Sequence, residues 1–305
     1  MKRVLALGAL LGLSACQGFI DDKAAESTLR ILEKSQTAAR RLPDVQLARE
    51  ALPSGIIQLG AFALAYPDYR GFRVLHADSL CQYAIAFVFD DFETAELQGR
   101  GEELTRLGAR VRALAGACVE ANLALLPATW RDARVKGGAA WDARVAAATK
   151  NDVPQLLWIT TTDAIEVALN PLGGIAKLGS IIAALEKCIA LQPGFHDSDA
   201  EMLLGTLLAG KSRFMGGPDG SDKFADARKQ LGEGALLVDV MYARGVLVSR
   251  KDRAGFTAAL TKVLEADATR WPERRLANEL ARMKAAHYLV AIDQLIPPEA
   301  PAPAE

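Results

Sequence analysis

The chain has 305 residues, of which 50% are hydrophobic and 24% are charged, and its mean hydropathy of +0.10 allows one large core or two modest ones. Aromatic residues make up only 6%, and runs of alternating β-branched residues are absent, which favours helices over sheets. The formal net charge is -1 with lysine and arginine dispersed, so we expect no nucleic-acid partner.

The first residues have the pattern of a signal sequence rather than of a folded element. Met1–Arg3 is a short basic stretch, and residues 4–13 are apolar but too few to span a bilayer. The segment Leu13-Ser14-Ala15-Cys16 follows directly and resembles the lipobox at which bacterial lipoproteins are cleaved. We expect residues 1–15 to be a lipoprotein signal peptide, with a plain signal peptide cut at a small residue as the alternative.

The resemblance to a lipobox implies that Cys16 begins the mature chain and is acylated. Anchoring by more than one acyl chain is stable. Gln17, rather than an aspartate, follows the cysteine, and general lipoprotein sorting then points to the outer membrane. We expect residues 16–23 to form a lipidated tether that holds the protein on the periplasmic face of the outer membrane.

Apolar residues at helical spacing, separated by proline and glycine, predict helices along the rest of the chain. The expected helices cover residues 24–41, 45–65, 69–89, 93–125, 141–148, 153–169, 175–191, 198–214, 222–232, 236–248, 252–267 and 273–295. Apart from the short helix, residues 127–150 are expected to be irregular. We expect residues 297–305 to be a disordered tail.

Residues 152–193 predict two helices joined by a Gly-Gly turn. Pro154 falls in the first turn of the first helix, where its missing N–H costs nothing, and Gly173-Gly174 separates the two helices. The segment Ala184–Pro193 resembles the second helix and closing proline of a tetratricopeptide repeat, a unit that must stack on neighbours to bury its apolar stripe. We therefore expect an all-α fold of stacked antiparallel helical hairpins, a tetratricopeptide-repeat-like superhelix, in one domain over residues 24–296.

Three cysteines remain after Cys16, namely Cys81, Cys118 and Cys188, and none has CxxC spacing. If the chain turns near residues 90–91 between antiparallel helices, Cys81 lies about 14 Å from the turn and Cys118 about 40 Å from it. The two thiols should then not meet. Each cysteine falls in an apolar stripe, which favours buried small hydrophobic residues over a disulfide, a metal site or a nucleophile.

The sequence lacks the motifs of common enzymes. It contains no HExxH, GxSxG, Walker loop or strand followed by GxGxxG, and we expect neither an enzyme nor a cofactor. His76 and His287 fall on helix stripes, which favours positions in the core or at its rim over catalysis.

The third histidine, His196, lies in a turn beside Asp197 and Asp199. This combination could bind a metal, but helix capping explains it more simply. Ser198 with Glu201 three residues later has the form of a capping box. We therefore expect a capped helix start here and no metal site.

Candidate binding residues come from one aromatic stripe, the bulky Trp158 of the helix over residues 153–169, and one loop. Tyr83, Phe87 and Phe89 could line an apolar passage, although aromatic stripes at helical spacing are more often core. The loop at residues 215–220 carries two glycines that would let the backbone come close to a ligand or a neighbouring chain, with an ordinary inter-helix loop as the alternative. The candidate ligand-binding or partner-binding residues are Tyr83, Phe87, Trp158, Met215, Gly216 and Gly217.

Several segments, taken in order, resemble the T-component proteins associated with tripartite ATP-independent periplasmic (TRAP) transporters. They are Arg49–Pro53, Tyr83–Val88, Asp152–Trp158, Met215–Gly217 and Arg275–Asn278. The resemblance implies a tetratricopeptide-like lipoprotein that docks the substrate-binding P-component of such a transporter. It further implies a hydrophobic passage for a small apolar ligand, and self-association into a homo-oligomer.

The function expected from these features is that of a non-enzymatic periplasmic adaptor anchored to the outer membrane. The alternative is a general repeat scaffold lipoprotein in cell-envelope assembly. An envelope hydrolase that uses His196 and its acidic neighbours is the least favoured hypothesis.

Overall fold

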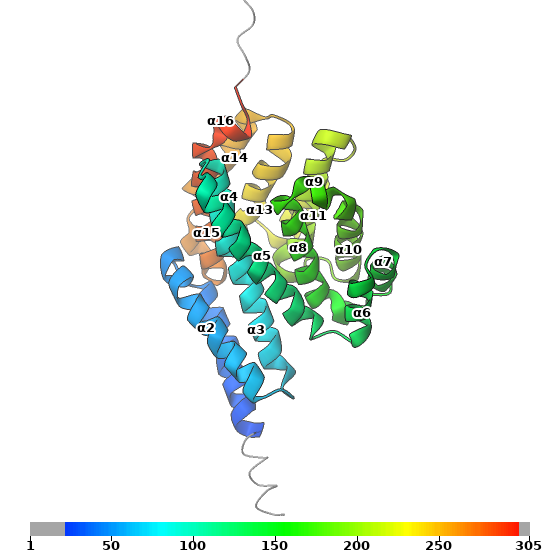
Figure 1. Cartoon of the computed structure of the whole chain (residues 1–305). Helices are drawn as coiled ribbons and strands as arrows, with labels where there is room; N and C mark the ends of the chain where they lie inside the picture. The colour runs from blue at the N-terminus through cyan, green and yellow to red at the C-terminus, as the bar shows by residue number, and fades with distance from the viewer. Residues whose placement is uncertain (1–21, 299–305) are drawn as a thin grey trace, which may run out of the picture.

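The computed structural model describes residues 22–298, and within that range every regular element is a helix, as Figure 1 shows. After a first helix over residues 22–40, the α-helices are α2 (Val45–Ala65), α3 (Arg70–Tyr83), α4 (Asp90–Leu97), α5 (Gly101–Leu123), α6 (Ala128–Lys136), α7 (Gly138–Ala146), α8 (Val153–Leu169), α9 (Pro171–Gly174), α10 (Leu178–Leu191), α11 (Phe195–Met215), α12 (Ser221–Leu231), α13 (Leu236–Tyr242), α14 (Arg253–Glu265), α15 (Arg275–Val290) and α16 (Ile292–Leu295). The prediction of an all-α fold is confirmed.

Short helical segments of other types join these elements. The 3-10 turns are η2 (Lys150–Asp152), η3 (Ile175–Lys177), η5 (Ala268–Arg270) and η6 (Pro272–Arg274). Two π-helical segments, η1 (Ala84–Phe89) and η4 (Ala243–Leu247), continue α3 and α13 without a break. Because η1 leads directly into α4, the chain stays helical from residue 70 to residue 97.

Two expectations about helix boundaries are wrong. The helix expected over residues 93–125 is divided at Gly99, whose φ of 66° belongs to the left-handed region, so α4 ends there and α5 begins at Gly101. Residues 127–150, expected to be largely irregular, form α6 and α7 around the packed rings of Trp130 and Trp141. The packing of these two indoles stabilises two short helices that the local sequence pattern does not predict.

The helices pack against one another largely in chain order. Helix α2 packs on α3, α3 on α5, α5 on α8, α8 on α10, α10 on α11 and α11 on α12, while α15 packs against both α13 and α14. Helix α15 also contacts α2, so the C-terminal helices lie beside the N-terminal ones in Figure 1. The two predicted helices of residues 152–193 are present as α8 and α10, with α9 and η3 between them. The repeat-like superhelix and the single domain stay predictions.

A buried cluster of charges joins the N-terminal and C-terminal helices. Lys284 of α15 places its Nζ 2.5 Å from Oδ1 of Asp90 and 3.3 Å from Oε2 of Glu93, both on α4. The Nε of Arg244, in η4, lies 3.2 Å from Glu93 Oε1, and the hydroxyl of Tyr288 donates to Glu93 Oε2 at 2.6 Å. Each charge in this cluster has an opposite partner, which burial requires.

The helix that ends at Arg250 is closed by a Schellman motif with an unusual residue at its left-handed position. The N–H of Lys251 donates to the carbonyl of Val248, and the N–H of Asp252 donates to that of Leu247. Lys251 itself has a φ of 56°, where glycine is the usual residue.

Replacing Lys251 with glycine should therefore raise the free energy of unfolding by about 1 kcal/mol, because the side chain is exposed and only the backbone penalty is relieved. Lys262→Gly, at an exposed position inside α14, is the matched control and should lower it by about 1 kcal/mol. Urea unfolding of both variants tests the prediction, and a Lys251→Gly protein less stable than the parent would contradict it.

Candidate functional site

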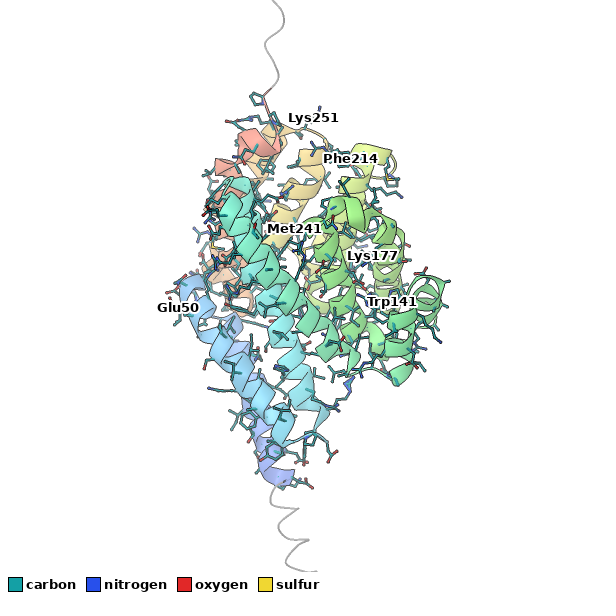
Figure 2. All side chains as sticks on the ribbon, in the orientation of Figure 1. Glu50, Trp141, Lys177, Phe214, Met241 and Lys251 are labelled. Atoms are coloured by element: carbon teal, nitrogen blue, oxygen red, sulfur yellow. A yellow bond between two sulfur atoms is a disulfide. The ribbon has the colours of Figure 1, made fainter. Side chains whose placement is uncertain are left out.

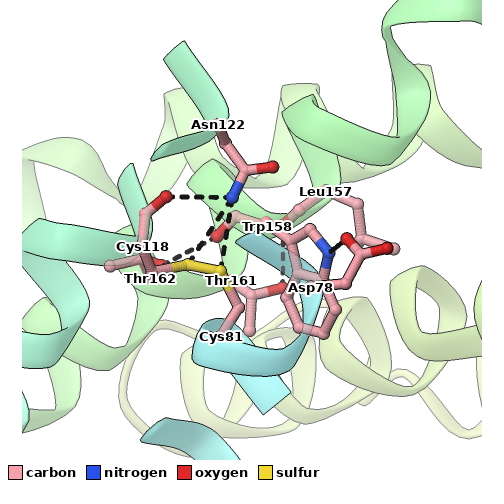
Figure 3. The surroundings of a disulfide bond; sticks show 8 residues. All are labelled: Asp78, Cys81, Cys118, Asn122, Leu157, Trp158, Thr161 and Thr162. Carbon is pink, nitrogen blue, oxygen red and sulfur yellow. Dashed lines mark hydrogen bonds between the residues drawn. A yellow bond between two sulfur atoms is a disulfide. The ribbon is translucent and has the colours of Figure 1, made fainter. Parts of the chain in front are cut away.

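A disulfide between Cys81 and Cys118 joins α3 to α5, with the sulfur atoms 2.02 Å apart and the Cα atoms 5.2 Å apart (Figure 3). The expectation that these thiols do not meet is wrong, and so is their interpretation as unpaired core residues. The error comes from the position of the turn, which is at Gly99 rather than near residues 90–91. Measured from Gly99, each cysteine lies about 27 Å along its helix, so antiparallel packing brings the two level.

Trp158 of α8 packs against this disulfide. Cys81, Cys118 and Trp158 form one buried cluster, and Asn122 donates from its amide to Cys81 Sγ at 3.2 Å and to the carbonyl of Cys118 at 2.9 Å (Figure 3). The hydroxyl of Thr162 donates to the Trp158 carbonyl at 2.8 Å. The candidate residue Trp158 is thus held by packing on a covalent link between two other helices.

The polar edge of Trp158 belongs to a cluster that joins α3, α8 and the start of α11. Its indole Nε1 donates to Asp78 Oδ1 at 2.8 Å, and its ring meets the ring of His196 edge to face at 5.0 Å. His196 Nδ1 lies 2.6 Å from Asp199 Oδ2, and Nε2 lies 3.4 Å from the amide of Gln82. Burial raises the pKa of the Asp78 carboxyl, against the opposing effects of the Trp158 N–H and the His196 charge.

The backbone that presents His196 is strained. His196, Asp197 and Ser198 have φ values of 51°, 56° and 59°, a left-handed turn made by three consecutive residues other than glycine. Each costs roughly 1–2 kcal/mol relative to a right-handed conformation. Strain of this kind persists where surrounding contacts fix the backbone, and it concentrates at functional sites.

The capping box expected at this turn is absent, and helix capping is the wrong interpretation of His196. Ser198 donates its hydroxyl to Gln230 Oε1 at 3.0 Å, and the carboxylate of Glu201 accepts from the N–H of Gly194 at 2.8 Å. The left-handed turn removes Ser198 from the geometry that an N-cap needs. Within residues 22–298, no group of three or more histidine, cysteine or acidic side chains is placed to hold a metal ion.

The stability that His196 contributes should fall as the pH rises above neutrality. Burial alone lowers the pKa of this imidazole, but the hydrogen bond that it donates to Asp199 and the charges of Asp199 and Asp78 outweigh burial and raise the pKa. The contribution is therefore complete below the unfolded-state pKa, about 6.5, and is lost as the pH rises through the folded-state pKa.

We expect the difference in unfolding free energy between the parent and His196→Gln to shrink from about pH 6 to about pH 9, measured by urea unfolding. His76→Gln is the control, because burial lowers the pKa of His76 and the contribution of His76 should grow as the pH rises. A His196→Gln difference that stays constant over this range would contradict the prediction.

Tyr83 and Phe87 are core residues rather than surface residues. They pack in one buried cluster, with their ring centroids 5.5 Å apart. The Tyr83 hydroxyl accepts from Arg110 at 3.1 Å, and the guanidinium of Arg49 lies 5.1 Å from the Phe87 ring while it bonds Asp91. These contacts assign both aromatics to the packing of the end of α3 and of η1 against α2 and α5.

Two open hollows on the surface have volumes of about 320 and 310 Å³. The first lies between α7 and α10. The second lies between α5 and α8, where Arg134 pairs with Asp163 at 2.7 Å and Arg112 with Glu166 at 3.9 Å. None of the six candidate binding residues lines either hollow.

Met215, Gly216 and Gly217 lie at the exposed end of α11, apart from the other candidates. Both glycines have positive φ, 73° and 100°, so the loop needs them to turn back along α12. The structure therefore brings Tyr83 and Phe87 together in the core and places Trp158 beside the disulfide. It leaves the loop on the surface.

Four large apolar side chains are exposed toward the same end of the α10 and α11 pair. The two helices pack together and are joined by a short turn, so the segment before α10 and the end of α11 lie at the same end. Figure 2 labels Phe214 and Lys177 in this part of the molecule. The apolar tip, as we name it, consists of Leu172 (94% exposed), Ile175 (59%), Phe214 (82%) and Met215 (64%).

Exposed basic residues flank the apolar tip. Lys177 follows Ile175, and Lys211 and Arg213 precede Met215, with the Arg213 guanidinium 5.5 Å from the Phe214 ring. Sequence reasoning found Met215 but missed the other three apolar residues. Large apolar side chains inside glycine-rich turns, Leu172-Gly173-Gly174 and Phe214-Met215-Gly216, are the signal that could have found them.

Cys16 and the predicted signal peptide lie outside the described residues, so the lipidation site stays a prediction. No helix within residues 22–298 combines the length and apolar character that crossing a bilayer needs.

Comparison with known proteins assigns the chain to a family. A protein of Treponema pallidum (strain Nichols), named only as uncharacterized, is 24% identical over 257 residues, which cover 79% of this chain and 77% of that protein. The sequence model of the TRAP transporter T-component family matches residues 42–295, which is most of the chain. That family is one of transporter components rather than of enzymes, which suggests a periplasmic or membrane-associated location. The chain belongs to the TRAP transporter T-component family.

Proposed function

We propose that this chain is a lipid-anchored adaptor that binds the substrate-binding P-component of a TRAP transporter through the apolar tip. The family match over residues 42–295 carries the transporter part of the proposal. The lipobox at Leu13–Cys16 supports the anchor, and Gln17 supports the outer membrane.

The composition of the tip supports its role as a docking surface. Large apolar side chains that cluster on a surface mark interaction sites, whereas single ones are ordinary. Aromatic and methionine side chains such as Phe214 and Met215 are enriched where partners bind. The charged residues that flank the tip, Lys177, Lys211 and Arg213, are all basic, so we expect an acidic rim on the P-component.

The position of the tip leaves it free for a partner. The first helix begins at the bottom of Figure 1, whereas Figure 2 labels Phe214 near the top of the same view. A chain anchored through Cys16 would therefore present its tip away from the membrane. The Cys81–Cys118 disulfide supports the periplasmic side, because disulfides persist in oxidising compartments.

Passage of a small hydrophobic ligand through the helical body and assembly into a homo-oligomer are further parts of the proposal. Tyr83 and Phe87 are the residues first expected to line a passage, and their burial means that a ligand would have to displace core contacts to reach them. Docking at the tip does not depend on either part.

Binding of the P-component of a TRAP transporter from the same organism tests the proposal. We expect the double variant Phe214→Glu/Met215→Glu to bind that protein at least tenfold more weakly than the parent, because it removes the centre of the apolar tip. Val135→Glu is the matched control, since Val135 is equally exposed but lies on α6.

The outcomes separate the parts of the proposal. Equal binding by the tip variant would reject the tip as the docking face. Failure of the parent to bind at micromolar concentration would reject the adaptor function and favour the general scaffold in envelope assembly.

A further inference from the structure

The outward face of α2 is apolar although no other described part of the chain covers it. Leu47 is 50% exposed, Ile57 74% and Leu64 85%. The exposed positions of the helix are Gln46, Leu47, Glu50, Ala51, Ser54, Ile57, Gln58, Ala61, Leu64 and Ala65. Glu50 is the one charged residue among them, and it lies near the start of the helix, away from Leu64.

The neighbouring first helix has an exposed face of the usual charged kind, with Ile31 (67% exposed) as its one large apolar residue. Its exposed positions include the charged residues Lys23, Glu26, Arg30, Glu33, Lys34 and Arg40. A helix that faces water normally carries charged and polar residues on its outer side. Both helices lie at the same edge of the molecule in Figure 1. Because the exposed face of α2 lacks the charges that the first helix carries, we expect another surface to cover α2.

The apolar end of α2 lies beside the point where the chain leads to Cys16. The hydroxyl of Tyr69, four residues after the end of α2, donates to Asp22 Oδ1 at 2.6 Å, which fixes the start of the first helix against this corner. Six residues lead from Cys16 to Asp22, and at no more than about 3.6 Å each they span at most about 22 Å. An acyl chain on Cys16 therefore holds the bilayer within reach of Leu64.

Aromatic side chains gather at the same corner. The ring of Tyr66 lies 6.0 Å from that of Tyr69 and 5.5 Å from that of Phe72, and Phe62 stacks on Phe72 at 5.4 Å. Both tyrosines are half-buried, with part of each side chain open to solvent. Tyrosine is enriched where a protein meets the head groups of a bilayer, because its ring is apolar and its hydroxyl is polar.

We propose that the outward face of α2, from Leu64 to Ile57, rests on the phospholipid surface to which Cys16 is anchored, with Tyr66 and Tyr69 at the level of the head groups. This inference rests on the lipid anchor of the proposed function. The contact orients the protein on the membrane, while the acyl chains supply the attachment.

The charges near this corner specify the kind of lipid. The acidic residues Asp22, Glu26 and Asp68 outnumber the exposed cations Lys23 and Arg70, so the corner carries a net negative charge. Acidic side chains repel anionic head groups, and basic side chains attract them. The face should therefore settle on zwitterionic phospholipid, and anionic lipid should weaken the contact.

Tryptophan reporters on a tethered protein test the contact. The mature chain that begins at Cys16 is coupled through the Cys16 thiol to a maleimide lipid in phosphatidylcholine vesicles, because Cys188 is buried and the other two cysteines are paired. Ile57→Trp and Leu64→Trp report on α2. Lys34→Trp, on the exposed side of the first helix, is the matched control.

The chain has four tryptophans of its own, so each variant is compared with the parent protein on the same vesicles. We expect the emission added by the tryptophans at positions 57 and 64 to lie further to the blue and to be quenched by brominated lipid, while the emission added at position 34 shows neither effect. Adding phosphatidylglycerol to the vesicles should reduce the quenching at position 64. Emission at positions 57 and 64 that matches the control would overturn the proposal, and so would quenching that increases with anionic lipid. A blue shift that grows with protein density and is not quenched by bromine would also overturn it, because a second copy of the chain would then cover the face.

Failure of this proposal is distinguishable from failure of the anchor. The tether is attached chemically, so the vesicle experiment does not depend on acylation in the cell. Incorporation of an alkyne fatty acid into the parent but not into Cys16→Ser tests the anchor separately.

Discussion

Replacing both Cys81 and Cys118 with alanine is expected to lower the free energy of unfolding by about 4 kcal/mol. The disulfide closes a loop of 37 residues between α3 and α5, and the entropy that such a link removes from the unfolded chain gives a stabilisation of about this size. Both cysteines are fully buried, so native protein should resist reductant, and the loss should appear only when the bond is removed genetically or reduced after unfolding. Urea unfolding with linear extrapolation measures it.

Cys188→Ala is the control for the loss of a buried sulfur without the loss of a link. Burial, together with the charge of Glu201, raises the pKa of the Cys188 thiol to about 12, so this thiol stays protonated and does not exchange with the disulfide. The single variant should cost about 1 kcal/mol. If the Cys81→Ala/Cys118→Ala variant lost no more than twice this amount, the loss of two buried sulfur atoms would explain the whole effect, and the covalent link would contribute no stability of its own.

The sequence predicts the helices well because their signals are local. The apolar spacing of each helix and Pro154 in the first turn of α8 depend on residues within a few positions of one another. The disulfide was not predicted because the distance between Cys81 and Cys118 depends on where the chain reverses direction, and that turn is far from both cysteines in the sequence. Gly99 and Gly101 were visible in the sequence, but a helical pattern on both sides hid the turn between them.

In the candidate site, too, local features could be predicted from the sequence and contacts between distant residues could not. Trp158 could be chosen from its size and position, but its partners Asp78 and His196 come from other helices and carry no signal of the contact. The turn at His196 could not be predicted, since residues other than glycine adopt the left-handed conformation singly and a run of three has no local signal. Of the apolar tip only Met215 was predicted, because a sequence does not show that the packing of α10 against α11 brings Leu172 and Ile175 to the end of α11.

Replacing Lys284 with methionine is expected to lower the free energy of unfolding by about 3–5 kcal/mol. Lys284 is the cation between Asp90 and Glu93. Its removal leaves Asp90 without its buried partner and leaves Glu93 with one cation, Arg244, and the Tyr288 hydroxyl. Methionine fills similar space, so the loss measures charge rather than a cavity. Chemical unfolding at neutral pH is the measurement.

The same cluster fixes how the effect depends on pH. Burial raises the pKa of the Glu93 carboxyl, but the charges of Lys284 and Arg244 and the hydrogen bonds from Tyr288 and Lys284 outweigh it, so the pKa is lowered. A lowered pKa gives stability that is complete above the unfolded-state value, about 4.3, and that is lost as the pH falls through the folded-state value. Without Lys284 the Glu93 pKa should rise, and acid unfolding should begin at a higher pH.

Two further variants make this prediction specific to the cluster. Lys262→Met removes an exposed lysine of α14 and should change stability by less than about 0.5 kcal/mol. Tyr288→Phe removes only one hydrogen bond to Glu93 and should cost about 1.5–3 kcal/mol, less than Lys284→Met. If Lys284→Met instead matched Lys262→Met in stability and in its acid transition, the cluster would not hold α4 against α15, and the apolar contacts of α13, α14 and α15 would have to stabilise that junction without it.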